Sequence, residues 1–128
     1  MSTRILTAEN ILELHDRLIA KHGGLYGVRD EDLFLFLCDA PYQQFGGQDL
    51  YPTVIEKAAK YIDGFARHQV FFDGNKRVAA ASAMFLLKAN DYIPTYKAGE
   101  LADLTLTVAN TDISFEDIAD NIREHVHQ

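Results

Sequence analysis

The stretch from Asp73 to Leu87 reads Asp-Gly-Asn-Lys-Arg-Val-Ala-Ala-Ala-Ser-Ala-Met-Phe-Leu-Leu. From Val78 onward almost every position is apolar, so a helix here has no polar face to turn toward water. Such a helix belongs in the interior of a protein, and its small alanine side chains allow neighbouring helices to come close. We therefore expect a helix from about Gly74–Asn75 to about Asn90 that forms the buried centre of the fold.

Amphipathic segments surround this central helix on both sides. Apolar residues recur at helical spacing, and Thr7, Asp30 and Ser114 stand where N-cap residues are expected. His15 falls on the apolar face of the first segment, beside Asp16, and is interpreted as a structural histidine. The expected helices cover approximately residues 7–23, 30–40, 52–65, 99–110 and 114–125.

A short segment from Tyr42 to Tyr51 has a different character. Gly46-Gly47 lies between two polar and aromatic arms, a pattern typical of a β-hairpin or flap. The sequence thus predicts an all-α fold: a compact helical bundle around a buried central helix, with a short β-hairpin flap. The length of 128 residues fits a single domain spanning residues 1–128.

Composition narrows the range of functions. The net charge of −7 makes binding to a nucleic-acid backbone improbable, so no direct nucleic-acid partner is expected. The only cysteine, Cys38, lies in an apolar run and is interpreted as a core residue rather than a nucleophile. No apolar run is long enough to cross a bilayer and the N-terminus does not resemble a signal peptide, so we expect no membrane association and a cytoplasmic location.

The segment just before the central helix carries the chemistry. The free backbone N–H groups at a helix start attract anions, and Gly74 lets a ligand approach the backbone closely. Lys76 and Arg77 add positive charge suited to phosphate oxygens. Asp73 would repel a phosphate unless a cation lay between them, and Mg²⁺ would resolve that conflict. The same residues also fit a second interpretation, in which Asp-Gly-Asn is only a turn and Lys76-Arg77 is a solvated surface.

A family resemblance favours the phosphate interpretation. The segment Phe71-Phe72-Asp73-Gly74-Asn75-Lys76-Arg77 resembles the active-site loop of the Fic/Doc superfamily, His-x-Phe-x-(Asp/Glu)-Gly-Asn-(Gly/Lys)-Arg. The resemblance extends over nearly the whole chain and is strongest to the death-on-curing (Doc) toxins of toxin–antitoxin modules. Further matching segments are residues 23–30, 41–47, 51–52 and 57–59.

The resemblance implies a function and a set of roles. Doc-like proteins carry Lys where AMP-transferring Fic enzymes carry Gly, and they are understood to transfer the γ-phosphate of ATP. Lys76 therefore implies a Mg²⁺-ATP-dependent phosphotransferase that modifies a protein hydroxyl, by resemblance a threonine of elongation factor Tu, and so blocks translation. By the same resemblance Asp73 would hold Mg²⁺, while Gly74, Asn75, Lys76 and Arg77 would surround the phosphates. The other implied features are a flap, Gln44, Phe45, Gly46 and Gly47, that holds the target peptide, and a small, partly disordered antitoxin encoded nearby.

One position departs from the family motif. The general base of the family is a histidine two residues before the motif phenylalanine, and that position here is Gln69. An amide cannot accept a hydroxyl proton at neutral pH, but His68 stands immediately before it. Either the loop holds one extra residue and His68 reaches the site, or Gln69 marks a weakened enzyme, through a natural or an engineered change.

Three functions therefore stay open at the level of sequence. The first is the phosphotransferase, for which the candidate catalytic residues are His68, Gln69, Asp73, Lys76 and Arg77. The second is AMP transfer by the same site. The third is a Fic/Doc scaffold that has lost catalysis and acts as a binding module.

Overall fold

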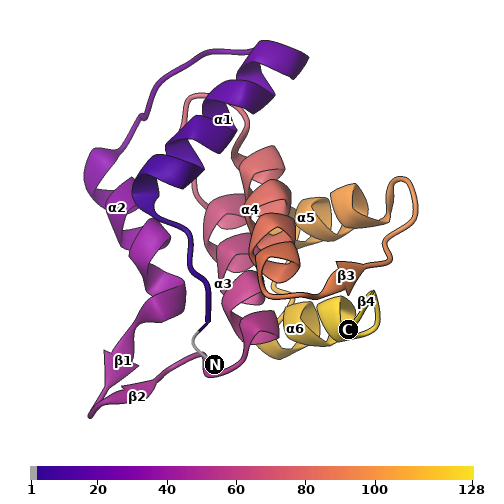
Figure 1. The fold of residues 1–128 in the computed structure, drawn as a ribbon. Helices are drawn as coiled ribbons and strands as arrows, with labels where there is room; N and C mark the ends of the chain where they lie inside the picture. Colours follow the sequence, from indigo (N-terminus) through magenta and orange to yellow (C-terminus); the bar gives the residue numbers. More distant parts are fainter. Residues whose placement is uncertain (1–2) are drawn as a thin grey trace.

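The computed structural model describes residues 3–128, and this part of the chain is mainly helical (Figure 1). It contains six α-helices, one 3₁₀ turn and two small antiparallel strand pairs, which confirms the predicted all-α class and the helical bundle. The elements are α1 (Ala8–His22), α2 (Glu31–Asp39), η1 (Ala40–Tyr42), β1 (Gln44–Phe45), β2 (Gln48–Asp49), α3 (Val54–Arg67), α4 (Asn75–Ala89), β3 (Ile93–Pro94), α5 (Glu100–Asn110), α6 (Phe115–Arg123) and β4 (Val126–His127).

Side-chain caps fix where most of the helices begin. Thr7, Asp30 and Ser114 each accept a hydrogen bond from a backbone N–H three residues later, which confirms the three predicted N-caps. The start of α3 needs a correction, because its N-cap is Thr53 and Pro52 lies outside the helix. Thr53 and Glu56 form a reciprocal capping box there, which satisfies two of the free N–H groups at the helix start.

The helices α3 and α4 form an antiparallel pair in the middle of the molecule (Figure 1). The helices α1 and α2 lie on one side of this pair, and α5 and α6 lie on the other. Tyr61, Phe65 and Phe71 are fully buried, and their ring centroids follow one another at 6.1 Å. This aromatic row runs from the middle of α3 into the loop that precedes α4, so the loop is part of the core.

The central position of α4 is confirmed, but the helix is not buried on every side. Phe85 is 54% exposed, although its neighbours in sequence, Leu86 and Leu87, are fully buried. Phe85 lines a cavity together with residues of α1, so this side of α4 stays partly open. The buried residues of α4 are Val78, Ala79, Ser82, Ala83, Leu86 and Leu87.

The predicted flap is a hairpin of two short strands. Gln44 pairs with Asp49, and Phe45 pairs with Gln48, leaving Gly46 and Gly47 as a two-residue turn. The hairpin is held at its base by Lys57 of α3, which is 3% exposed and donates to Asp49 Oδ2 at 3.0 Å. The flap therefore projects from the end of the molecule where α3 begins (Figure 1).

The C-terminal end of the chain differs from the expectation. The last helix was predicted to run to about His125, but α6 ends at Arg123 and the chain continues as β4. β4 pairs with β3, with Ile93 opposite His127. The backbone groups of the last residues thus find partners in a distant segment, and a pattern of local periodicity cannot reveal such a pairing.

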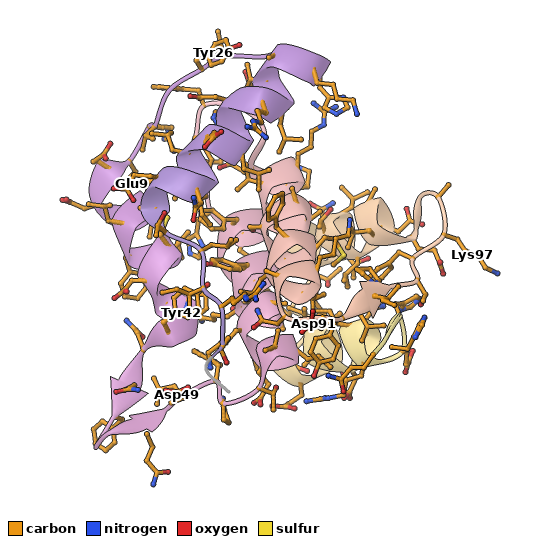
Figure 2. The ribbon with its side chains drawn as sticks, in the orientation of Figure 1. Glu9, Tyr26, Tyr42, Asp49, Asp91 and Lys97 are labelled. Atoms are coloured by element: carbon orange, nitrogen blue, oxygen red, sulfur yellow. The ribbon has the colours of Figure 1, made fainter. Side chains whose placement is uncertain are left out.

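Buried polar groups tie the N-terminal segment to the helices. The Tyr42 hydroxyl accepts from Leu6 N at 3.0 Å and lies 2.6 Å from the hydroxyl of Tyr61 (Figure 2).

Cys38 is 6% exposed, and burial together with the nearby carboxylates of Asp39, Glu9 and Glu31 raises the pKa of its thiol to about 12. The interpretation of Cys38 as a core residue is therefore confirmed. Between residues 3 and 128, the structure has no helix of the length and apolarity that a membrane span requires.

Candidate active site

The loop between α3 and α4 is fastened to a second loop by backbone bonds. Val28 and Phe71 form an isolated antiparallel bridge, and Arg29 N donates to Val70 O at 2.7 Å. The Arg29 guanidinium also donates to Gln69 O at 3.2 Å. Phe71 is fully buried and anchors the centre of the loop in the core, as its place in the motif suggests. The exposed residues further along the loop, Gln69 before it and Phe72 and Asp73 after it, are thus held in place.

Helix α4 begins without a side-chain cap. Its N-cap is Gly74, whose φ of +85° lies in the left-handed region that L residues other than glycine rarely adopt. Asn75 follows, and its side chain makes two bonds with Phe71, accepting from the backbone N–H and donating to the backbone carbonyl, each at 3.0 Å. The side chain of Asn75 therefore braces the loop, and the N–H groups at the start of α4 stay open to an anion.

Asp73 is held at two points. Its Oδ2 accepts a hydrogen bond from Leu25 N at 2.7 Å, and its backbone carbonyl accepts one from His15 Nε2 at 2.8 Å. Gly24 packs directly against it, since a Cβ on Gly24 would lie 3.1 Å from Asp73 Cβ. No side-chain partner within residues 3–128 contacts the second carboxylate oxygen, Oδ1, through a hydrogen bond. That oxygen is the one available to a metal ion.

A cleft of about 350 Å³ lies between the end of α3, the loop before α4 and the end of α5. The volume is sufficient for a nucleotide-sized ligand. Lys76 lines the cleft and is exposed, whereas Arg77 is exposed but is not one of the lining residues. Within residues 3–128 neither cation forms an ion pair, so both charges are available to a ligand. The lining residues are Ala66, Arg67, His68, Gln69, Phe72, Asp73, Gly74, Asn75, Lys76, Ala109 and Asn110.

Five of the lining residues were not predicted from the sequence. Phe72 lies within the motif and Ala66 and Arg67 shortly before it, so their closeness along the chain was a usable signal. Ala109 and Asn110 stand at the C-terminal end of α5 and form the far wall of the cleft. No sequence pattern connects these two residues to the motif, because only the packing of α5 against α3 and α4 brings them there.

His68 and Gln69 both line the cleft, so the structure brings the two competing residues to the same place. His68 is the C-cap of α3, and its Nδ1 lies 2.8 Å from the carbonyl of Gly64. Because a carbonyl can only accept, Nδ1 must carry the proton, which leaves the lone pair of the neutral ring on Nε2. His68 thus presents a nitrogen that can accept a proton, and Gln69 presents an amide that cannot.

The flap is not brought to the cleft. It precedes the first residue of α3, whereas the cleft begins at the last two residues of that helix, and a 14-residue helix is about 21 Å long. None of the flap residues Gln44, Phe45, Gly46 and Gly47 lines the cleft. The flap therefore lies at the other end of α3 from the cleft (Figure 1), and its role in holding a target peptide stays a prediction.

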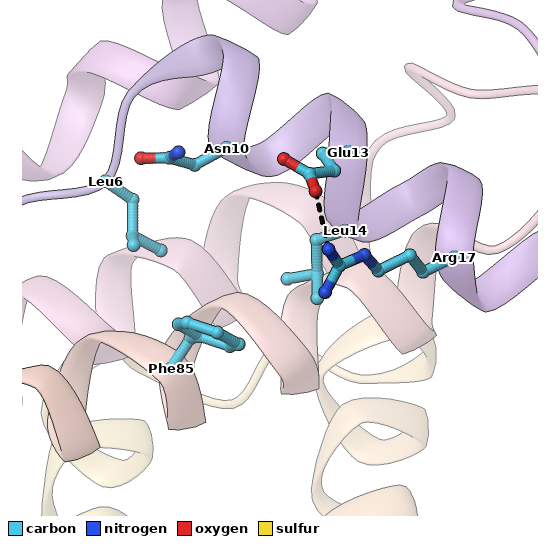
Figure 3. A pocket seen from close by; sticks show the side chains of 6 residues that line it. All are labelled: Leu6, Asn10, Glu13, Leu14, Arg17 and Phe85. Carbon is cyan, nitrogen blue, oxygen red and sulfur yellow. Dashed lines mark hydrogen bonds and ion pairs between the residues drawn. The ribbon is translucent and has the colours of Figure 1, made fainter.

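A second cavity, of about 290 Å³, lies between α1 and α4 (Figure 3). Leu6, Leu14 and Phe85 give it an apolar floor, and Glu13 and Arg17 form an ion pair of 2.6 Å at its edge. None of its lining residues belongs to the loop before α4. We therefore leave this cavity outside the candidate active site.

The donor set at the cleft fits a nucleotide-bound Mg²⁺ and does not fit a metal ion held by the protein alone. Among the described residues, 3–128, no group of three His, Cys, Asp or Glu side chains lies close enough to bind a metal. Mg²⁺ commonly takes one or two protein carboxylates and completes its coordination with substrate phosphates and water. Asp73, with one oxygen anchored and one free, is suited to that arrangement.

Comparison with known proteins agrees with this geometry. A family model described as the Fic/DOC family matches residues 5–87. The chain is 32% identical over 120 residues to the protein kinase doc of Escherichia phage P1, and the alignment covers 94% of each protein. It is 33% identical over 99 residues to the toxin Doc of Mycolicibacterium smegmatis, over 76% of each protein. With more than half of the chain matched by the family model, and the active-site loop among the matched residues, this chain belongs to the Fic/DOC family.

Proposed function

We propose that this protein is the toxin of a toxin–antitoxin module and that it transfers the γ-phosphate of ATP to a protein hydroxyl. The observation that carries this proposal is the uncapped start of α4, flanked by an anchored carboxylate, Asp73, and by Lys76, which forms no ion pair within the described residues 3–128. The names of the two relatives, a protein kinase and a toxin, support it. The motif lysine, Lys76, favours phosphoryl transfer over nucleotidyl transfer, by resemblance to Doc-like proteins.

The nucleotide would be held by groups that the structure keeps open. The backbone N–H groups of Asn75, Lys76 and Arg77 are the free donors at the start of α4, and Gly74 has no side chain to obstruct them. Asp73 Oδ1 would hold Mg²⁺, which neutralises phosphate charge when it is bound. Because the Asn75 side chain is committed to Phe71, we assign the phosphate contact of Asn75 to its backbone.

His68 is the proposed general base. Its Nε2 accepts the proton of the target hydroxyl, whose oxygen then forms a bond to the γ-phosphorus. The bond between that phosphorus and the bridging oxygen breaks, and ADP leaves with the electron pair. Base catalysis commonly contributes about 10²–10⁴-fold, while positioning and charge stabilisation supply most of the acceleration of a phosphoryl transfer. The protein can therefore retain activity if His68 lies in a less favourable position than the family histidine.

The target and the partner follow from the family resemblance. We propose a threonine of elongation factor Tu as the acceptor, and a small antitoxin encoded in an adjacent gene as the inhibitor. The cytoplasm supplies both ATP and elongation factor Tu and is the corresponding location. The protein would then stop translation when the antitoxin is lost.

A catalytically weakened binding module is the second candidate, because Gln69 occupies the position of the family base. Incubation with elongation factor Tu and ATP labelled at either the γ or the α phosphate separates the possibilities. Label from the γ position alone supports phosphoryl transfer, and label from the α position supports AMP transfer. If neither label reaches the target while Mg²⁺-ATP still binds, the protein is a binding module.

Substitution of the two candidate residues assigns the base. We expect His68→Ala to lower the transfer rate by about 10²-fold or more, and Gln69→Ala to change it much less. Both side chains are exposed, but His68→Ala also removes the bond to the Gly64 carbonyl, so thermal unfolding of each variant provides the control. If Gln69→His raises the rate strongly and His68→Ala has no effect, His68 is not the base.

A further inference from the structure

His15 is a fully buried histidine on α1 that contacts the loop before α4 on the side facing the core. Its Nε2 lies 2.8 Å from the backbone carbonyl of Asp73, and a carbonyl can only accept, so Nε2 carries the donated hydrogen. The other ring nitrogen, Nδ1, lies 3.6 Å from Asp16 Oδ1 and has no hydrogen-bond partner within residues 3–128. Within residues 3–128 the ring thus makes one hydrogen bond, and that bond is with the loop.

A histidine is an unfavourable residue for this position unless the single bond matters. A buried polar atom without a partner destabilises a protein, and an apolar side chain of similar size would avoid that cost. The ring also stacks on Phe71 at a centroid distance of 3.9 Å, with planes only 8° apart. A leucine or methionine could fill the same space against Phe71. What only a donor can supply here is the bond to Asp73.

The contact determines how the loop meets the cleft. His15 lies directly under the turn, since a Cβ on Gly74 would come within 3.5 Å of its ring atoms Cδ2 and Nε2. Asp73 is therefore anchored twice, through its carbonyl by His15 and through Oδ2 by the backbone N–H of Leu25. With both anchors in place, the free carboxylate oxygen and the open N–H groups of α4 have fixed relative positions.

We propose that His15 is a positioning residue for the transfer reaction: it holds the backbone of Asp73 so that the metal-binding carboxylate and the start of α4 are set for Mg²⁺-ATP. This inference rests on the proposed function. His15 does not contact the nucleotide or the hydroxyl, because it is fully buried below the loop. Its effect is on the placement of Asp73 and Gly74.

Three variants test the proposal. His15→Leu removes the donor but fills the core, and His15→Gln keeps an N–H near the position of Nε2. Ile11→Val is the matched control, since Ile11 is fully buried one turn earlier on the same helix and has no contact with Asp73 through a hydrogen bond. The first measurement is hydrogen exchange of the Leu25 amide, which reports the bond to Asp73 Oδ2 without any nucleotide. The second is the dissociation constant of Mg²⁺-ATP.

We expect His15→Leu to accelerate exchange at Leu25 and to weaken Mg²⁺-ATP binding, each by about tenfold or more, as changes behind a metal ligand do. His15→Gln should restore both to within about threefold of the wild type, and Ile11→Val should leave both unchanged after correction for any loss of global stability. The proposal is overturned if His15→Leu leaves Leu25 protected, or if Ile11→Val weakens binding as much as His15→Leu. Should the wild type fail to bind Mg²⁺-ATP, the proposed function fails, and the exchange at Leu25 still decides whether His15 positions Asp73.

Discussion

The helices α3 and α4 begin at opposite ends of the molecule, and their starts are built in different ways. Thr53 and Glu56 close the start of α3 with a reciprocal capping box. Gly74 begins α4 in the left-handed region and supplies no side-chain bond. A glycine at an N-cap is only a few tenths of a kcal/mol worse than serine, so leaving α4 open costs little. The comparison teaches that side-chain caps satisfy the donors at one start, whereas the other start leaves its donors without a capping side chain.

The surroundings of the two starts differ in the same sense. Beside α3, the buried Lys57 forms an ion pair with Asp49 and also donates to the carbonyl of Tyr51. Its positive charge is therefore neutralised within the protein. Beside α4, Lys76 and Arg77 have no ion-pair partner within residues 3–128. A helix start with open donors and unpaired cations is suited to an anion. The following predictions test this difference, from the largest expected effect to the smallest.

Of the changes at the start of α4, which has no capping side chain, Asp73→Asn should have the largest effect. The amide oxygen can still accept from Leu25 N, so the fold is preserved, but the charge that would hold Mg²⁺ is lost. We expect Mg²⁺-ATP binding to weaken by at least about tenfold and phosphate transfer to fall by about 10²-fold. Calorimetric titration with and without Mg²⁺ measures the binding. Equal Mg²⁺ dependence in the variant and the wild type would count against Asp73 as a ligand.

Gly24→Ala should disturb the start of α4 through steric crowding of Asp73. Gly24 has a φ of +117°, and an added Cβ would lie 3.1 Å from Asp73 Cβ and 3.2 Å from Ile19 Cδ1. We expect the free energy of unfolding to fall by about 2 kcal/mol and Mg²⁺-ATP binding to weaken, because Asp73 must move. Gly23→Ala is the control, since its φ is +83° and nothing lies within 4 Å of the added Cβ. Urea unfolding of both variants separates strain from crowding, and equal losses would rule out the contact with Asp73 as the cause.

Thr53→Ala tests the start of α3, which carries the capping box. It removes the hydroxyl that accepts from Glu56 N, so we expect the free energy of unfolding to fall by about 1 kcal/mol. Mg²⁺-ATP binding should stay unchanged, because the start of α3 is about 21 Å from the cleft. Thr53→Ser keeps the cap and should behave as the wild type in urea unfolding. A loss of nucleotide affinity in Thr53→Ala would contradict the prediction that nucleotide binding is independent of the cap of α3.

Asp49, beside the closed start, should give the smallest effect, visible only in acid. Hydrogen bonds from Gln44 and Lys57, and the charge of Lys57, hold the pKa of its carboxyl below the usual 3.8. A carboxyl with a lowered folded pKa stabilises the protein above pH 3.8, and that contribution is lost as the pH falls through the folded pKa. The stability difference between wild type and Asp49→Asn should therefore be present at neutral pH and shrink below pH 3.8. Urea unfolding at about pH 6 and pH 3 measures it, and a difference that does not shrink would contradict the pairing.

Local patterns were sufficient for much of the fold. The caps Thr7, Asp30 and Ser114 and the turn at Gly46-Gly47 were predicted because each acts within a few residues along the chain. The start of α3 was misplaced by two residues: Pro52 suits the first turn of a helix, but Thr53 and Glu56 have the spacing of a capping box and their reciprocal bonds set the start. The pairing of β4 with β3 joins segments about thirty residues apart, and no local pattern indicates it.

The candidate site divides in the same way. The identity of the motif residues Asp73 to Arg77, and the departure at Gln69, can be read directly in the sequence. The two anchors on Asp73 could not, because they come from α1 and from the loop after it, 58 and 48 residues away. The wall formed by Ala109 and Asn110, and the distance of the flap from the cleft, likewise depend on how helices pack.

The sequence by itself determined the helical class, the central helix and the family motif at its start, since propensity, periodicity and a contiguous motif are local properties of the chain. Only the tertiary structure decided that Asp73 is fixed by His15 and Leu25 and that His68 lines the cleft with Nδ1 bonded to the Gly64 carbonyl. These features depend on contacts between residues far apart in the sequence or on the direction of a side chain. Such contacts form when buried surfaces are matched across the whole molecule, so they are determined by packing and not by neighbours along the chain.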